Sequence, residues 1–331
     1  MDSDSIEKTV VLDIPVTSFE HYTRLWGSCN GLICLSNQEK GIFLWNPSTK
    51  KHWKLPVCPI ETVPTFSSNV VNAVYGFGYD SVTDDYKVVR VVQHHGVAFM
   101  DSEVWVYSLK SNSWKEVRDF PDYLSIGQEP GLFSGGALNW VAMNQLGGEK
   151  PDAIVSFDLA TERYRIVPQP EYKDANFRLF AEVLEGCLCV LCCYDKVRVD
   201  IWVMKEYRVK ESWKKLMSIE HSNDRRYAGG VKLLGYSKSG GKVLFQYDSG
   251  RCKWYDIKEG TVEEASIRGT PGYFEADVCE GSLVRLEGGG GNREKKHATQ
   301  AKSMKKTNKK KRSSMRFAGK VNFIIVRIWV A

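Results

Sequence analysis

The sequence predicts an all-β fold: a kelch-like, β-propeller-like domain of five or six blades, followed by a disordered basic tail. Short apolar stretches led by glycine begin near residues 30, 75, 135, 185, 229 and 280, with a mean spacing close to 50 residues. That period is typical of propeller blades. Aromatic residues make up 12% of the chain and favour β structure, because they pack well on pleated sheets. A β-sandwich with long connections is the alternative, since the same strand signals serve both architectures.

Two units recur in each period. The first is a glycine followed by alternating apolar residues, and its clearest copies span 30–35, 135–140, 185–190 and 280–284. The second is a hairpin with an apolar strand, a polar turn and a second strand that carries an aromatic residue. Its copies span 42–56, 104–117, 154–167, 199–216 and 243–257. Each period therefore holds about four short strands, which is the content of one propeller blade.

Aromatic residues form pairs seven or eight positions apart in these hairpins, namely Trp45/Trp53, Tyr107/Trp114, Phe157/Tyr164 and Tyr247/Trp254. At that spacing the two members can meet across the strands. Tryptophans also recur with the repeat, at Trp45, Trp53, Trp105, Trp114, Trp202 and Trp213. This regularity favours packing in the core over a ligand-binding cage.

Charge and composition divide the chain into three segments. Residues 1–25 predict one strand and a turn, 26–287 form the repeat domain, and 288–331 form a basic low-complexity tail. The tail has 13 Lys/Arg and one acid, so its net charge is +12; the whole chain carries +6, which leaves −6 on residues 1–287. We expect the tail to be disordered, because it opens with four glycines and is highly charged. Its last apolar run, 321–331, could add a strand to a blade edge.

The tail also bears on location and partners. A nuclear import signal is predicted at Lys305, Lys306, Lys309, Lys310, Lys311 and Arg312, with a solvated charge run as the alternative. Nucleic acid is not an expected partner, except non-specifically through the tail. Nine cysteines, an odd number, and the lack of a signal-peptide pattern favour the cytoplasm, the nucleus or both. No stretch is long and apolar enough to predict a membrane span.

No pattern for catalysis, cofactor binding or metal ligation emerges. Cys189 and Cys192 have CxxC spacing, but no second ligand pair accompanies them, as a structural zinc site would need. We expect buried free thiols there, with a redox site as the alternative. The better candidates for binding a partner are loops whose length differs between repeats, at 59–72, 93–101, 120–130, 143–152 and 225–228.

Several stretches, in a fixed order across roughly residues 6–287, resemble the plant F-box-associated interaction domain (type 1). They are 26–34 (WGSCNGLIC), 44–50 (LWNPSTK), 75–80 (YGFGYD), 84–89 (DDYKVV) and 104–109 (VWVYSL). Among plant F-box proteins the chain is similar to the constitutive-defence-repressor type. The residues that we assign to the family pattern, and expect to be structural, are Trp26, Cys29, Asn30, Gly31, Leu32, Trp45, Asn46, Pro47, Gly76, Gly78, Asp80, Asp85, Tyr86, Lys87, Trp105, Tyr107, Trp114, Gly136, Trp140, Phe157, Asp158, Trp202 and Trp213.

The resemblance implies a non-enzymatic domain that binds target proteins for ubiquitination, as the substrate receptor of an SCF-type ubiquitin ligase. A Skp-type adaptor and a cullin would be the further partners. In that family a helical F-box precedes the domain, whereas residues 1–25 show no such pattern, so we expect no tight adaptor binding by this chain alone. Two alternatives stay open. One is a propeller enzyme of glycan-processing or oxidase type, with convergent carboxylates or metal ligands near the axis; the other is a free-standing scaffold that competes with full-length relatives.

Overall fold

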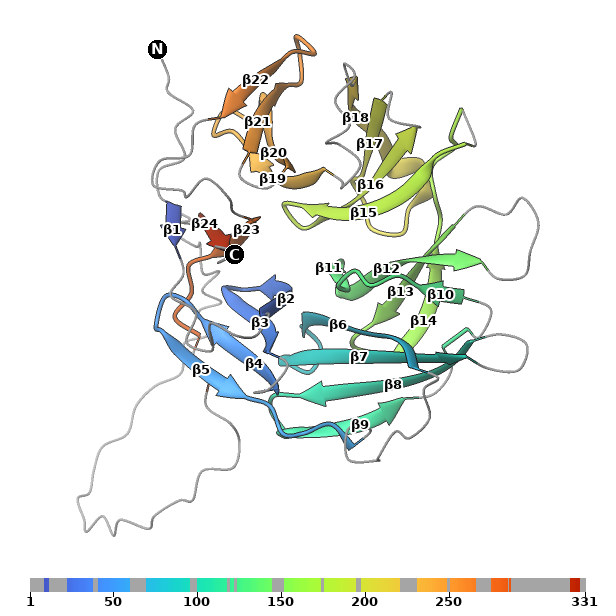
Figure 1. Cartoon of the computed structure of the whole chain (residues 1–331), viewed down its shortest axis with the longest axis vertical. Helices are drawn as coiled ribbons and strands as arrows, with labels where there is room; N and C mark the ends of the chain where they lie inside the picture. Colours follow the sequence, from blue (N-terminus) through green and yellow to red (C-terminus); the bar gives the residue numbers. More distant parts are fainter. Residues whose placement is uncertain are drawn as a thin grey trace, which may run out of the picture.

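The computed structural model describes residues 9–11, 23–37, 41–59, 70–95, 100–117, 120–121, 124–144, 152–173, 176–194, 198–220, 231–248, 251–265, 275–284, 286 and 322–327. Within them the chain forms six β-sheets arranged in a ring (Figure 1). A turn of 3-10 helix, η2 (Lys210–Ser212), lies between two strands. No helix in these described ranges is long and apolar enough to cross a membrane.

Five sheets are blades, in which the strands pair antiparallel from an inner first strand to an outer last strand. Blade 1 contains β2 (Thr23–Cys29), β3 (Leu32–Asn37), β4 (Gly41–Asn46) and β5 (Lys51–Lys54). Blade 2 contains β6 (Val70–Asp80), β7 (Asp85–His95), β8 (Met100–Ser108) and β9 (Ser113–Val117). Blade 3 contains β10 (Leu124–Ile126), β11 (Leu132–Ser134), β12 (Ala137–Asn144), β13 (Ala153–Asp158) and β14 (Arg163–Val167). In this blade the first position is shared by two short strands, β10 and β11, which both pair with β12. Blade 4 contains β15 (Arg178–Leu184), β16 (Cys187–Tyr194), β17 (Arg198–Met204) and β18 (Trp213–Glu220), and blade 5 contains β19 (Lys232–Tyr236), β20 (Lys242–Asp248), β21 (Arg251–Asp256) and β22 (Val262–Ala265).

The sixth sheet closes the ring between blade 5 and blade 1. It contains β1 (Thr9–Val11), β24 (Asn322–Arg327) and β23 (Glu275–Glu280), in that order. Strand β23 contacts both β19 and β2, so it occupies the inner position of this closing sheet. The prediction of a propeller-like ring with five or six blades is confirmed, as five blades and a three-stranded closing sheet. The apolar run 321–331 contains β24, whereas the predicted import signal lies outside the described residues.

The repeat predicted from the sequence is one strand out of phase in blade 5. Four of the predicted hairpins are the third and fourth strands of blades 1 to 4, but 243–257 covers β20 and β21, the second and third strands of their blade. Of the predicted aromatic pairs, Tyr107/Trp114 and Phe157/Tyr164 face each other across their hairpins. Trp45 is paired with His52 instead of Trp53, and Trp254 is paired with Leu244. The second and third strands of a blade are both rich in apolar residues, so the pattern alone does not distinguish one hairpin of a blade from the next.

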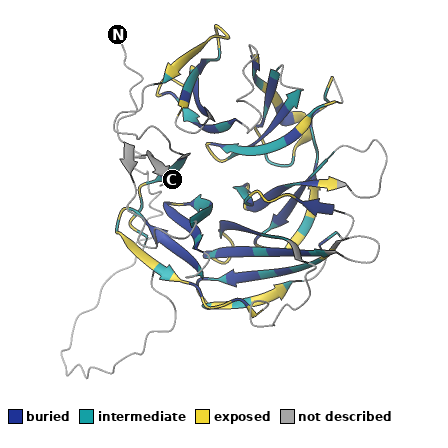
Figure 2. Cartoon of the chain, in the orientation of Figure 1, coloured by how far each residue is buried: buried dark blue, intermediate teal, exposed yellow. Residues whose placement is uncertain are grey.

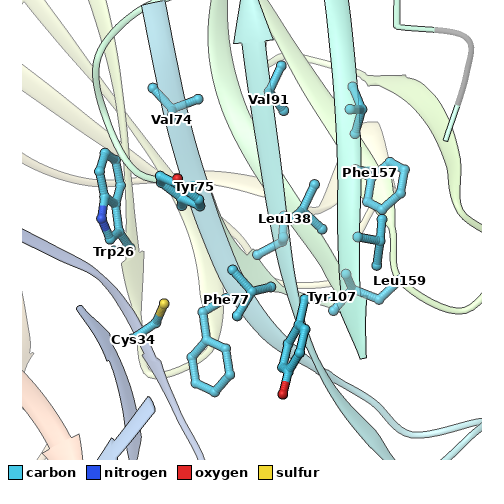
Figure 3. Packing of buried hydrophobic residues seen from close by; sticks show 14 of the residues in the cluster. Trp26, Cys34, Val74, Tyr75, Phe77, Val91, Tyr107, Leu138, Phe157 and Leu159 are labelled. Carbon is cyan, nitrogen blue, oxygen red and sulfur yellow. The ribbon is translucent and has the colours of Figure 1, made fainter. Parts of the chain in front are cut away.

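The apolar core consists of clusters between neighbouring sheets. The largest spans blades 1 to 3 and includes Trp26, Tyr75, Phe77, Tyr107, Leu138 and Phe157 (Figure 3). Further clusters join blades 3 and 4 (Ile154, Val190), blades 4 and 5 (Val203, Phe245), blade 5 and the closing sheet (Leu244, Ala276), and the closing sheet and blade 1 (Ile33, Cys279). Exposed residues gather on outer strands such as β5, β9 and β22 (Figure 2). Because both faces of a blade are covered, a middle strand such as β3 is a continuous apolar run instead of an alternating one.

Candidate functional site

Each blade has two kinds of connection, and they lie at opposite ends of its strands. Turns between first and second strands, and between third and fourth strands, share one end, which we call the turn face. Connections between second and third strands, and crossovers to the next blade, share the other end, the loop face. The inner strands run the same way around the ring, as the parallel bridge between Gly76 and Gly131 shows. The two ends therefore form two faces of the whole ring.

Local sequence explains the hairpins of the turn face. Between first and second strands, Asn30-Gly31, Gly135-Gly136 and Glu185-Gly186 all have positive φ angles. Two consecutive positive φ values are the mark of type I′ turns, which favour glycine and asparagine, and this accounts for the glycine that leads these three repeats. Between third and fourth strands, Asn46, Asp158 and Asp256 each accept two backbone N–H groups with Oδ1. The residue four positions later then has positive φ, at Lys50, Glu162 and Gly260.

Asn46 also closes the ring. It is fully buried, and its Nδ2 donates to the carbonyl oxygens of Ser282 (3.1 Å) and Val284 (2.9 Å). Ser28 Oγ donates to Val278 O at 2.9 Å. Gly31 lies against the same segment, because a Cβ added there would stand 2.2 Å from Cβ of Ser282. The family-pattern residues of blade 1 thus hold the chain after β23 onto the first blade.

A buried lysine ties blade 2 to blade 3 on the turn face. Lys87 Nζ donates to Leu159 O at 2.6 Å and lies 3.0 Å from Asp80 Oδ2 and 3.5 Å from Glu162 Oε1. Asp80 in turn accepts the backbone N–H of Val82 at 2.9 Å. These hydrogen bonds hold the pKa of the Asp80 carboxyl below its usual value, although burial opposes them. The lysine charge is thereby compensated, as a buried charge must be.

A second polar tie joins blade 4 to blade 3. Tyr207 OH donates to Asn139 Oδ1 at 2.8 Å, and its ring lies over Gly135, where an added Cβ would be 2.2 Å away. Arg208 donates to Ser156 Oγ at 2.9 Å and lies 3.5 Å from Asp158 Oδ2. Both residues follow β17, so the longer turn of blade 4 serves to reach its neighbour.

Three glycines let the inner strands approach closely. A Cβ on Gly76 would stand 2.8 Å from Leu138, one on Gly78 would stand 2.3 Å from Phe133, and one on Gly131 would stand 2.4 Å from Trp140. Gly131 N also donates to Tyr75 O at 2.8 Å. These positions need glycine for packing space, which agrees with a structural role and not with a phosphate-binding loop.

The remaining family-pattern residues also make internal contacts. Trp26 Nε1 donates to Ser36 Oγ at 2.7 Å, and Asp85 Oδ1 accepts Lys110 N at 2.9 Å. Trp114 and Trp213 donate to the carbonyls of Pro56 and Pro168, both at 2.8 Å, where crossovers begin. Buried members are Cys29, Leu32, Trp45, Trp140, Phe157 and Trp213, half-buried members are Pro47, Tyr86, Trp105, Trp114 and Trp202, and Gly136 is exposed. The tryptophans therefore pack between blades, and those that are half-buried also expose part of their surface to solvent.

The five predicted binding loops connect strands on the loop face, and most of their residues lie outside the described ranges. Residues 120–130 are an exception, because they contain the buried strand β10. This strand could not be predicted from the sequence, because one side of it is hydrogen-bonded by a side chain instead of by a neighbouring strand. Gln93 on β7 donates to Leu124 O at 2.9 Å and accepts Ile126 N at 2.8 Å. Gln246 on β20 accepts Ala276 N of the closing sheet in the same way, at 2.9 Å.

Charged residues of several inner elements interact near the axis of the ring. Glu182 on β15 has Lys232 on β19, Asp277 on β23 and Glu129 before β11 as its charged neighbours. Lys232 forms an ion pair with Asp277. Burial raises the pKa of Glu182 to about 8, and Lys232 offsets this only in part. The predicted alternative of an axial enzyme site would require convergent carboxylates or metal ligands, whereas these residues supply one acid with a raised pKa and one ion pair. No sequence signal marks these residues, because each is an ordinary charged residue in a separate repeat.

The predicted CxxC pair, Cys189 and Cys192, lies in the apolar core of blade 4. Burial raises the pKa of the Cys189 and Cys192 thiols, which leaves them protonated and unreactive. They belong to clusters on opposite faces of β16, so they do not face each other. Among the described residues, no group of three or more His, Cys, Asp and Glu side chains is placed to hold a metal ion.

Comparison with known proteins identifies the family. The model of the F-box associated beta propeller domain matches residues 2–285. The chain belongs to this family. It is 35% identical to F-box protein CPR1 of Arabidopsis thaliana over 86% of this chain and 73% of that protein. It is 31% identical to F-box/kelch-repeat protein At3g23880 of the same plant, over 80% and 69%.

Solved structures show only a distant likeness. An oligogalacturonate lyase in complex with manganese gives a TM-score of 0.44 at 10% identity, over 72% of this chain and 63% of that one. A six-bladed fungal lectin from Aleuria aurantia gives 0.39 at 12% identity, over 76% and 79%. At these TM-scores the likeness gives no information about activity.

Proposed function

We propose that this F-box-associated domain recognises target proteins for ubiquitination, as the receptor part of an SCF-type ubiquitin ligase. Family membership across residues 2–285 is the observation that carries the proposal. Relatives such as CPR1 are named F-box proteins, and an F-box joins its protein to a Skp-type adaptor and a cullin. Ubiquitin transfer would then be the work of other subunits, and this chain would supply recognition without catalysis.

The loop face is the part of the domain that we assign to recognition. On the turn face, the side chains of Asn46, Lys87 and Arg208 close the ring and tie neighbouring blades together. Connections on the loop face vary in length between blades, as binding loops on a rigid scaffold do. A location in the cytoplasm, the nucleus or both stays a prediction.

The test is affinity capture from a plant extract on the immobilised full chain, with one exposed apolar residue changed on each face. Met143, on the loop-face end of β12, is 55% exposed, and Val82, in the turn between β6 and β7, is 79% exposed. Met143→Glu should abolish capture of the target, and Val82→Glu should leave it intact. The captured protein should also be ubiquitinated when the domain is joined to an F-box and combined with adaptor and cullin. Capture that survives Met143→Glu and fails with Val82→Glu would reverse the assignment.

A further inference from the structure

An aromatic cluster lies on the loop face where blade 3 crosses to blade 4. We call it the crossover platform, and define it as Tyr172, Phe177, Tyr194 and Arg198. The Tyr172 and Phe177 rings are 4.7 Å apart, Phe177 and Tyr194 are 5.4 Å apart, and the Arg198 guanidinium lies 4.3 Å from the Tyr194 ring centroid. All four residues are half-buried, so each presents part of its surface to solvent.

The platform is held rigidly from below. Tyr172 packs edge-on against Trp202 of β17 at 6.5 Å, and its OH donates to Gln169 Oε1 at 2.8 Å. Gln169 Nε2 donates to Asp152 O at 2.6 Å, which fixes the crossover to the start of β13. Aromatic side chains that are already ordered lose little entropy when a partner binds, and tyrosine and arginine are enriched among residues that dominate binding energy.

Cations outnumber acids among the described charged residues around the platform. Lys173 and Arg178 next to it are exposed. The exposed acid Glu171 is paired with Lys210 at 2.9 Å, and the buried acid Asp200 lies 2.9 Å from Lys215 Nζ and 3.5 Å from Arg198 Nε, so cations compensate both acids. Residues 1–287 as a whole carry a net charge of −6. Within residues 1–287, which are acidic overall, an acidic partner is therefore attracted to this place.

We infer that the crossover platform is the docking site for an acidic segment of the target protein, one that also carries an aromatic or aliphatic anchor. This inference rests on the proposed function, since it names the part of the loop face that recognises the target. The anchor would cover the rings of Tyr172, Phe177 and Tyr194, while carboxylates would pair with Lys173 and Arg178.

The probe is a random dodecapeptide library displayed on phage and selected against the full chain. Enriched peptides should be acidic and contain an aromatic or aliphatic residue. Their affinity, measured by fluorescence anisotropy with the synthetic peptide, should fall at least ~10-fold in Arg178→Glu and in Phe177→Ala. Lys173→Glu should have a similar effect. The matched control is Arg163→Glu with Arg165→Glu, on the outer strand β14, where both arginines are exposed; it should leave the affinity unchanged.

Two outcomes overturn the inference. One is enrichment of neutral or basic peptides, or of none. The other is acidic peptides whose affinity is the same for the platform variants and the wild-type chain. Because Lys173 and Arg178 are exposed, these charge reversals test binding without a loss of folding. If the peptides bind elsewhere while Met143→Glu still abolishes target capture, only the platform assignment fails; if target capture itself fails, the proposed function fails.

Discussion

Asn46 shows how one side chain serves both a turn and the closure of the ring. Its Oδ1 accepts the N–H groups of Ser48 and Thr49, while its Nδ2 donates to two carbonyls of the segment 282–284. An aspartate would supply the acceptor but no donor, and a buried carboxylate would face two carbonyl oxygens.

We expect Asn46→Asp and Asn46→Ala each to lower the free energy of unfolding by about 3 kcal/mol, since several buried hydrogen bonds are lost. The control is Asp256→Asn, at the same turn position in blade 5, where Oδ1 accepts N–H groups of Lys258 and Glu259. That change should leave the stability nearly unchanged. Urea denaturation measures both, and equal effects at the two positions would contradict the closure role.

Glu182 links stability to pH. Its pKa is raised to about 8 in the folded chain from an ordinary value of 4.5, so the folded state holds the proton more tightly than the unfolded state. This stabilisation is complete below pH 4.5 and is lost as pH rises through 8. We expect Glu182→Gln, which keeps the neutral form, to remove this part of the decline in melting temperature between pH 5 and 9. If the melting temperature depends on pH in the same way for the variant and the wild-type chain, Glu182 is solvated and its pKa is not raised.

At the level of the elements, the type I′ turns offer a matched pair of glycines. Gly31 and Gly136 have φ angles of +77° and +76°, but a Cβ would clash with the closing segment only at Gly31, and nothing lies within 4 Å at Gly136. Gly136→Ala should therefore report backbone strain alone, of the order of 1 kcal/mol. Gly31→Ala should cost about 2 kcal/mol more, because the contact between blade 1 and Ser282 must open. Equal losses of stability in thermal unfolding would remove Gly31 from the closure.

The elements also show what the sequence could and could not predict. Glycine-led turns and third-strand aromatics are local signals, so the blades and most hairpins were predictable. Strand β10 was not, because part of its hydrogen bonding comes from the Gln93 side chain of another blade. Likewise the tie from Lys87 to Leu159 depends on contact between neighbouring blades, and the platform depends on packing of the crossover against the end of β16. From the sequence, the loop face could be predicted only as a set of loops of variable length. No local pattern distinguishes a half-buried aromatic cluster such as the platform from one in the core.

For the whole molecule, the tail offers a test of how the ring is stabilised. Strand β24 of the tail adds backbone pairing to β23 and to β1. Deletion of 288–331 should leave the five blades folded with a modest loss of stability. It should also abolish retention on heparin at low salt, because the net charge changes from +6 to −6. If the shortened chain unfolds far below the melting temperature of the full chain, the tail is an integral part of the ring.

The central claim, that the loop face of this F-box-associated domain recognises a target protein, is tested most directly by site-specific photo-crosslinking. A benzophenone amino acid is placed at Met143 on the loop face or at Val82 on the turn face, both of them exposed. Each chain is irradiated together with the captured target, and the cross-linked sites are mapped by mass spectrometry. The account predicts cross-links to the target from position 143 and none from position 82. Cross-links from position 82 alone would contradict it.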